Sequence, residues 1–155
     1  MEPVLRAATL ADAQFLFDLR TDPDVAAASA AHPPVDLAQH LLWLERAIKS
    51  QDRWLFIIED AGQRALPLGQ CRLDLIDYGR SAEVSIALIR SARGQGIGTA
   101  VLHIVALAAA DRGVRWLEAV IKETNHASRK AFLKAGYSVE EIKDGIVHMG
   151  YKCGS

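Results

Sequence analysis

Apolar and polar residues follow two rhythms along this chain, and each rhythm predicts one kind of secondary structure. Amphipathic helices are predicted where apolar residues recur every three or four positions, and this pattern covers residues 10–21, 37–50 and 125–136. A longer, almost wholly apolar run over residues 98–112 follows a cluster of glycines and predicts a more buried helix. The chain is therefore expected to contain about four helices.

The first two helices carry start signals. Thr9 and Asp36 stand where these helices begin, and each side chain can accept a hydrogen bond from a free amide of the first turn. The segment between the two helices, residues 22–36, contains three prolines and many small residues, so we expect a loop that can include one helical turn. The second helix is expected to bury one apolar face, made of Leu37, Leu41, Leu44 and Ile48.

Strands are predicted where short apolar runs lie between turn residues. These runs are residues 3–9, 54–60, 67–77, 82–89, 115–121, 137–142 and 145–152. The three strands between residues 54 and 89 follow one another through short turns and are expected to form an antiparallel meander. The last two are expected to form a final antiparallel pair. The helix over residues 98–112 lies between two strands, so this unit requires a parallel crossover.

This element order places the chain in the mixed α/β class. We expect a mixed, mostly antiparallel sheet of about six or seven strands, flanked by about four helices in a layered sandwich. A chain of 155 residues in which 50% are hydrophobic can bury one core, so residues 1–155 are expected to form a single domain.

Charge and cysteine content narrow the classes of function. The formal net charge is −1 and the pI is near 6.5, which gives no basic surplus for nucleic acid. Cys71 and Cys153 are too few for a disulfide framework and lack the His and Cys neighbours of a zinc site, so no metal is expected. The N-terminus has no signal-peptide pattern and no window reaches the length of a membrane span, so we expect no membrane contact and a cytoplasmic location.

Three alternating glycines in "RGQGIG", residues 93–98, stand before the long apolar helix. Bare amides at a helix start can hold a phosphate, although the same glycines can also serve a tight strand-to-helix turn. A P-loop is excluded because no Gly-Lys-Ser/Thr follows. A dinucleotide fingerprint fails at Thr99, and a looser version with Ala100 and Glu118 is disfavoured because too little chain follows for a doubly wound sheet.

Two separated motifs together resemble the GNAT superfamily of acetyl-CoA-dependent N-acyltransferases. The first is the pattern Q/R-x-x-G-x-G/A, met by Arg93, Gly96 and Gly98. The second is Asn-x-x-Ser/Ala with a later Gly-aromatic pair, met by Asn125, Ser128, Gly136 and Tyr137. The run over residues 41–60 is similar to the amino-sugar N-acetyltransferases of the pseudaminic acid type. The resemblance covers nearly the whole chain.

The resemblance implies acetyl-CoA as the acetyl donor and a set of residues that bind it. The loop would hold the pyrophosphate through Arg93, Gly94, Gln95, Gly96, Ile97, Gly98 and Thr99. The strand edge at Ile86, Ala87 and Leu88 would pair with the pantetheine arm, and Asn125 and Ser128 would contact the cofactor from the far side. Members of the family often form homodimers, so a homodimer is one expectation.

Acetyl transfer to an amine needs a base and a proton donor. Glu83, at the start of the strand that leads to the glycines, and Glu123, next to Asn125, are the two candidate bases. Each can also be a solvated charge. The family often has a tyrosine as general acid at the position of Phe132, which has no proton to give. Ser128 or solvent is then the candidate donor, since a thiolate leaves readily.

The acceptor is expected to contact the first two helices. Arg20, His40 and Trp43 are the candidate contacts, with Trp54 nearby, and each has an alternative role at the core edge or the surface. The expected activity is acetylation of a primary amine on a small molecule, with an amino-sugar nucleotide first. A peptide or protein N-terminal amine is the next alternative. The last is a module that binds acetyl-CoA without turnover.

Overall fold

A computed structural model describes residues 1–29, 33–34 and 36–154. The strands are β1 (Pro3–Ala7), β2 (Arg53–Asp60), β3 (Gln63–Ile76), β4 (Ser81–Leu88), β5 (Trp116–Lys122), β6 (Ser138–Lys143) and β7 (Ile146–Lys152). The helices are α1 (Ala13–Thr21), α2 (Pro23–Ala28), α3 (Leu37–Lys49), α4 (Ile97–Asp111) and α5 (His126–Lys134). Short 3₁₀ turns lie at η1 (Leu10–Asp12), η2 (Asp77–Gly79) and η3 (Arg90–Ala92).

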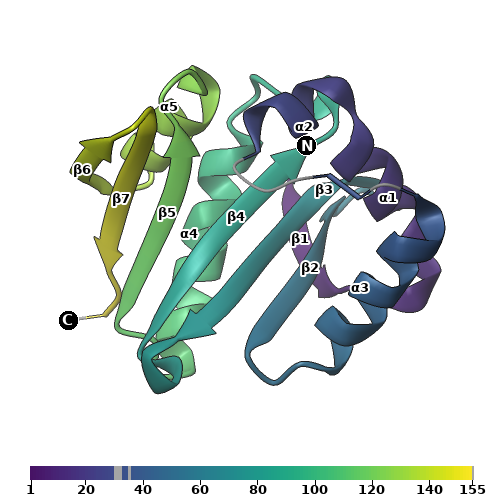
Figure 1. The fold of residues 1–155 in the computed structure, drawn as a ribbon, viewed down its shortest axis with the longest axis horizontal. Coiled ribbons are helices and arrows are strands. Elements are labelled where there is room, and N and C mark those ends of the chain that lie inside the picture. The colour runs from purple at the N-terminus through teal and green to yellow at the C-terminus, as the bar shows by residue number, and fades with distance from the viewer. Residues whose placement is uncertain (30–32, 35, 155) are drawn as a thin grey trace.

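The strands form one sheet in the order β1-β2-β3-β4-β5-β7-β6 (Figure 1). Every neighbouring pair is antiparallel except β4 and β5, which are parallel. The mixed, mostly antiparallel sheet, the meander, the crossover and the final hairpin are therefore confirmed. Beyond the four helices predicted, the structure contains α2, a short helix in the segment expected to be a loop with a helical turn. Residues 30–32 and 35 of this segment lie outside the described residues. Asp22 caps α2, and Pro23 at its first position suits a helix start.

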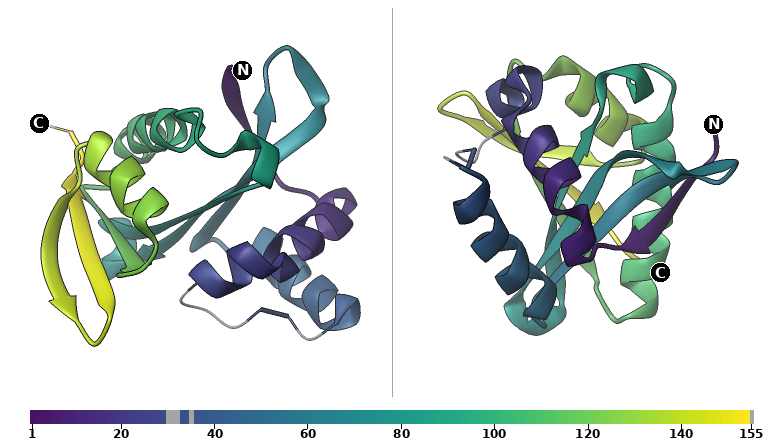
Figure 2. Two further views of the ribbon diagram at one scale, coloured as in Figure 1. Left: turned by 90° about the horizontal axis from the view of Figure 1, so that it is seen from above. Right: turned by 90° about the vertical axis from the view of Figure 1, so that its right-hand side faces the viewer.

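Helices cover both faces of the sheet. Figure 2 shows α4 and α5 on one side and α1, α2 and α3 on the other. Under α4 the core contains Leu73 of β3, Leu102 of α4 and Leu117 of β5, each fully buried. On the other face Leu16 of α1 and Leu44 of α3 pack against β2. Among the residues described, no helix combines the length and apolar character needed to cross a membrane.

The parallel pair β4 and β5 is short. Their register joins Ser81–Glu83 of β4 to residues 116–118 of β5, and the rest of β4 continues without pairing to β5. In Figure 1 the two strands diverge toward their carboxyl ends. The sheet is therefore open along one edge of β4 from Val84 to Leu88, and polar backbone groups of this edge are available to a ligand.

The buried face of α3 differs from the expected one. Leu37, Leu41 and Ile48 are 37%, 40% and 39% exposed, whereas His40, Leu44 and Ala47 are buried. Leu44 is the residue that the expected and the observed buried faces share. The observed face, which also contains His40 and Ala47, is the one that α3 turns toward the sheet. The small Ala47 side chain allows close approach there, and His40 packs between the rings of Phe17 and Trp43.

The first helix begins later than expected. Residues 10–12 form the 3₁₀ turn η1, and Leu10 in this turn is 55% exposed. Asp12 ends this turn, and its carboxylate accepts hydrogen bonds from the Thr9 amide (2.8 Å) and from two Arg6 nitrogens (2.7 and 2.9 Å). Arg6 also donates to Glu59 of β2 (2.7 Å). These hydrogen bonds from Arg6 and Thr9 hold the pKa of Asp12 below its ordinary value.

Candidate active site

A cavity of about 870 Å³ occupies the opening between β4 and β5. Its walls are residues 83–88 of β4, the end of β5, the loop and first turn of α4, and one side of α5. Parts of α2 and the end of α1 close the remaining side. The opening exists because β4 and β5 pair over three residues and then separate.

The glycine loop forms one end of this cavity. Gly94 and Gly96 have φ angles of 73° and 78°, in the left-handed region that glycine tolerates without strain. Gly96 caps α4, and in the described part of the chain the amides of residues 94–99 have no intramolecular acceptor. Free amides at a helix start attract an anion. Lys130 and Lys134 of α5, which also line the cavity, add positive charge.

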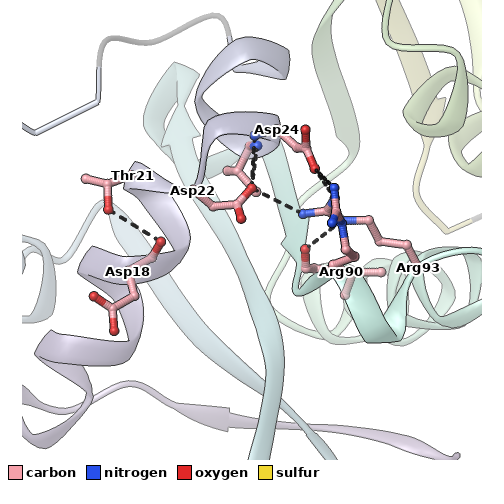
Figure 3. A network of polar contacts seen from close by, with 8 residues as sticks. Asp18, Thr21, Asp22, Asp24, Arg90 and Arg93 are labelled. Atoms are coloured by element: carbon pink, nitrogen blue, oxygen red, sulfur yellow. Dashed lines mark hydrogen bonds and ion pairs between the residues drawn. The ribbon is translucent and has the colours of Figure 1, made fainter.

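Arg93 lies beside this loop and is held by acids from α2 and its cap. Its Nε donates to the Leu88 carbonyl at 3.0 Å, and its Nη1 donates to Asp24 at 3.2 Å. Asp22 lies 3.6 Å from its Nη2, and Arg90 makes a second ion pair with Asp24 at 3.2 Å. Figure 3 shows these acids facing the two arginines. The cluster ties α2 to the loop at the rim of the cavity.

Glu83 lies on the cavity wall, on the face of the sheet that α1 and α3 cover. In the register of β3 and β4 it stands opposite Asp74, and Ser85 stands opposite Arg72. Burial first, and then the charges of Asp74 and Glu118, raise the pKa of Glu83, while Arg72 opposes this shift. The other candidate base, Glu123, is exposed and lies outside the cavity lining.

The α5 wall carries the second predicted motif. Asn125 caps α5, its Oδ1 accepting from the Ser128 amide at 3.2 Å, and both residues also line the cavity. Phe132 is 2% exposed, lines the cavity and meets Tyr137 edge-on at 4.8 Å. Tyr137 lies in the core behind it, and burial raises its pKa. Within the described cavity lining there is no tyrosine to serve as an acid.

The predicted acceptor residues divide into two groups. Arg20 lines the cavity, whereas His40 is fully buried and Trp43 is half-buried beneath Arg20, whose guanidinium lies 4.0 Å from the indole centroid. The structure therefore places His40 and Trp43 behind the cavity wall instead of on it. Trp54 lies elsewhere, with Arg112 over its ring at 4.7 Å.

The predicted cofactor residues are nearly all brought together. Those that line the cavity are Ile86, Ala87, Leu88, Arg93, Gly94, Gly96, Ile97, Gly98, Thr99, Asn125 and Ser128. Gln95 is the exception, because its side chain turns back to donate to the Ser91 carbonyl at 2.7 Å. Sequence reasoning missed Gln70 and Arg72 of β3. The alternation of residues along β3 could have identified them, because Gln70 and Arg72 stand opposite Ala87 and Ser85 of β4.

The arrangement supplies what a thioester cofactor with a pyrophosphate would need. Free amides and lysines stand at one end, an open strand edge runs along the middle, and a half-buried carboxyl stands near the other end. The first group fits an anion, the strand edge fits an amide-containing arm, and the carboxyl fits a proton acceptor. These residues fit coenzyme A.

Comparisons with known proteins agree with this fit. A 75-residue segment is 36% identical to the Bacillus subtilis protein YwnH, which is named for phosphinothricin acetylation; the match covers 48% of this chain and 46% of that protein. The matched segment thus spans under half of that relative.

The fold is also that of solved acetyltransferase structures. Spermidine N-acetyltransferase from Vibrio cholerae, solved with CoA and spermine, superposes with a TM-score of 0.87 at 18% identity, covering 98% of this chain and 96% of that one. AAC(6′)-Ib, solved with paromomycin and acetyl-CoA, has a TM-score of 0.81 at 18% identity, covering 98% and 94%. The family model of the acetyltransferase (GNAT) domain matches residues 4–138, so the chain belongs to this family.

Proposed function

We propose that this protein is an N-acetyltransferase that moves an acetyl group from acetyl-CoA to a primary amine of a small molecule. The observation that supports it best is one cavity joining an unpaired amide loop, an open strand edge and the carboxyl of Glu83. Membership of the GNAT family supports acetyl-CoA as the donor. The similar proteins that are named for spermidine and phosphinothricin acetylation, or were solved with paromomycin and acetyl-CoA, support a small amine as acceptor.

In this proposal the cofactor lies along the cavity. The amides of residues 94–99 bind its pyrophosphate, and the edge of β4 at residues 86–88 pairs with the pantetheine arm. Asn125 and Ser128 approach it from α5. Acetyl-CoA supplies an acyl group on a good leaving thiolate.

Residues of this chain would then handle the protons. Glu83 accepts a proton from the acceptor ammonium, directly or through water, because burial makes it a stronger base than an exposed carboxylate. The backbone N–H groups of the open β4 edge polarise the carbonyl oxygen. Ser128 or solvent returns a proton to the thiolate, since Phe132 offers none.

The finer choice of acceptor remains a proposal. An amino-sugar nucleotide ranks first, as the similarity of residues 41–60 predicts. The similar proteins are named for phosphinothricin and spermidine acetylation. They do not support a particular similarity to the acetyltransferases of the pseudaminic acid type. The core position of Tyr137 and the phenyl ring of Phe132 favour one competing function, a module that binds acetyl-CoA without turnover.

Ligand-induced thermal stabilisation tests the donor. Acetyl-CoA at 100 times its dissociation constant is expected to stabilise the fold by about 2.7 kcal/mol, because it binds only the native state. NADP serves as the matched control and should leave the melting temperature unchanged. A shift with NADP and none with acetyl-CoA would contradict the donor.

Release of free CoA then separates the enzyme from the binding module. With acetyl-CoA and a panel of amino sugars, polyamines and peptides, a thiol reagent should detect CoA in proportion to acetylated amine. Stabilisation by acetyl-CoA without CoA release from any acceptor would favour the binding module.

A further inference from the structure

Three arginines gather around the Trp43 ring beside the part of the cavity that contains Glu83, and we call this place the acceptor end. The guanidiniums of Arg20, Arg72 and Arg53 lie 4.0, 5.7 and 5.9 Å from the centroid of the Trp43 ring. They come from α1, β3 and β2, so three separate elements converge on this point. Arg20 and Arg72 line the cavity itself.

One acid, Asp74, is shared by two of the three arginines. Asp74 pairs with Arg53 at 2.7 Å through one oxygen and with Arg72 at 3.1 Å through the other. Arg20 has no carboxylate partner among the described residues. Its Nη1 instead contacts Nδ1 of His40, at 3.2 Å. Burial and the charge of Arg20 lower the pKa of that histidine, so it is a neutral acceptor.

An unpaired, half-buried guanidinium is costly unless a ligand compensates it. Burial, together with the charges of Arg72 and Arg53, lowers the pKa of Arg20 to about 10, so the group is still charged at neutral pH. A cavity wall that keeps a half-buried cation without a counter-ion offers it to an anion from outside the chain. The planar guanidinium suits the two oxygens of a carboxylate or a phosphate.

A second unpartnered group lies in the same cavity. Gln70 is 5% exposed and lines the cavity, and its Oε1 has no hydrogen-bond partner among the described residues. Gln70, Arg72 and Asp74 share one face of β3 by alternation, next to Glu83 across the register. A polar donor on the ligand would satisfy this oxygen.

From this juxtaposition we infer that the acceptor amine carries an anionic group, a carboxylate or a phosphate, which Arg20 and Arg72 bind while Glu83 faces the amine. The inference rests on the proposed acetyl transfer. Arg72 stands opposite Ser85, two residues along β4 from Glu83, and lines the same cavity as Arg20, so the anion-binding groups and the carboxyl of Glu83 face one space. A polyamine, which is wholly cationic, would be repelled by Arg20.

Matched acceptors that differ in the anion test the inference. The pairs are glucosamine 6-phosphate with glucosamine, and L-glutamate with its diamide. In at least one pair the anionic member should show a KM about tenfold or more below that of its neutral partner, because a charge-assisted hydrogen bond is lost in the latter. Arg20→Gln should remove this preference by raising KM for the anionic member, and Arg20→Lys should restore part of it.

Arg46→Gln is the matched control, because Arg46 is exposed on α3 and lies outside the cavity. This variant should keep the wild-type preference. Stabilisation of Arg20→Gln by acetyl-CoA shows that the variant is folded. Equal KM values within both pairs for the wild type, or a preference that survives Arg20→Gln, would overturn the inference.

A binding measurement separates this inference from the proposed transfer. With saturating CoA on the glycine loop, glutarate and inorganic phosphate are titrated in a thermal-shift assay. A shift in the wild type and Arg46→Gln that Arg20→Gln lacks supports the anion site, even if no acceptor releases CoA. Equal shifts in all three proteins, or no shift with either anion, overturn the site, even if neutral amines are acetylated.

Discussion

Glu83 is the residue whose surroundings bear most directly on the chemistry. It is half-buried on the cavity wall, and burial and Asp74 raise its pKa while Arg72 opposes the change. Because its pKa is raised, Glu83 loses its proton at a higher pH than an ordinary glutamate, whose pKa is about 4.3. A base with this property is better matched to neutral pH than an exposed carboxylate.

Glu83→Gln should therefore lower kcat about 100-fold or more and remove the acid limb of the pH profile that Glu83 supplies, because an amide cannot accept the proton. The measurement is CoA release across pH with acetyl-CoA saturating. Acetyl-CoA binding should be unchanged, since a neutral isostere replaces the side chain. Glu123→Gln, at an exposed position outside the cavity, is the control and should keep the wild-type profile. If Glu83→Gln keeps the wild-type pH profile as Glu123→Gln does, Glu83 is not the base.

Single side chains also mark the limit of prediction from sequence. The spacing of Arg93, Gly96 and Gly98 is local, so it was sufficient to identify a turn that frees backbone amides. The placement of His40 and Trp43 depends on how far α3 rotates about its axis. That rotation follows from long-range packing on the sheet, which apolar spacing within one helix does not determine.

At the scale of elements, the ladder of β1 and β2 is joined to the start of α1 by one charge network. Arg6 donates to Asp12 of η1 and to Glu59 of β2, and Asp12 also accepts from the Thr9 amide. Asp12 and Glu59 are 8% and 6% exposed. Hydrogen bonds to such poorly solvated charges contribute more than surface pairs.

Asp12→Asn should reduce the free energy of unfolding by about 1–3 kcal/mol, because the charge-assisted bonds to Arg6 are weakened. The lowered pKa of Asp12 also gives a pH dependence. Its stabilisation is present above the unfolded-state pKa of about 3.9 and is lost as pH falls through the folded-state value. Urea unfolding at pH 7 and pH 3 checks this. The difference between wild type and variant should shrink at pH 3, and a constant difference would contradict the linkage.

The element order could be predicted from sequence, but the strand order could not be read in full. Apolar runs and turns predicted the meander and the crossover, which are short-range features. The position of β7 between β5 and β6 depends on the pairing of β7 with β5, which is a contact between segments distant in sequence. For α2 the sequence indicated no more than a helical turn, because prolines and small residues favour a loop, although Asp22 and Pro23 supply a helix start.

For the whole molecule, the sheet divides where β4 and β5 separate. The strands on either side of this division contribute to one core under α4. Across the division itself, β4 and β5 pair over three residues. The cavity fills the remaining space between them. A ligand in the proposed position would therefore contact both parts of the sheet and join them.

Hydrogen exchange should report this joining. Acetyl-CoA is expected to slow exchange in residues 84–88, 94–99 and 119–122 together, because the proposed ligand covers or steadies these amides. The exposed edge strand β6 serves as an internal control, since it lies across β7 from the cavity, and its exchange should not change. Protection confined to the glycine loop would contradict a ligand that spans the opening.

The stacking of Arg20 on Trp43 has a practical consequence for spectroscopy. The chain has three tryptophans, and Trp43 is the one with guanidiniums of the acceptor end over its ring. An anion that draws Arg20 away from the indole would change the polarity at that ring and hence its fluorescence emission. The protein thus carries an intrinsic optical probe at the place where its acceptor is proposed to bind, and candidate acceptors can be screened without a label or a coupled assay.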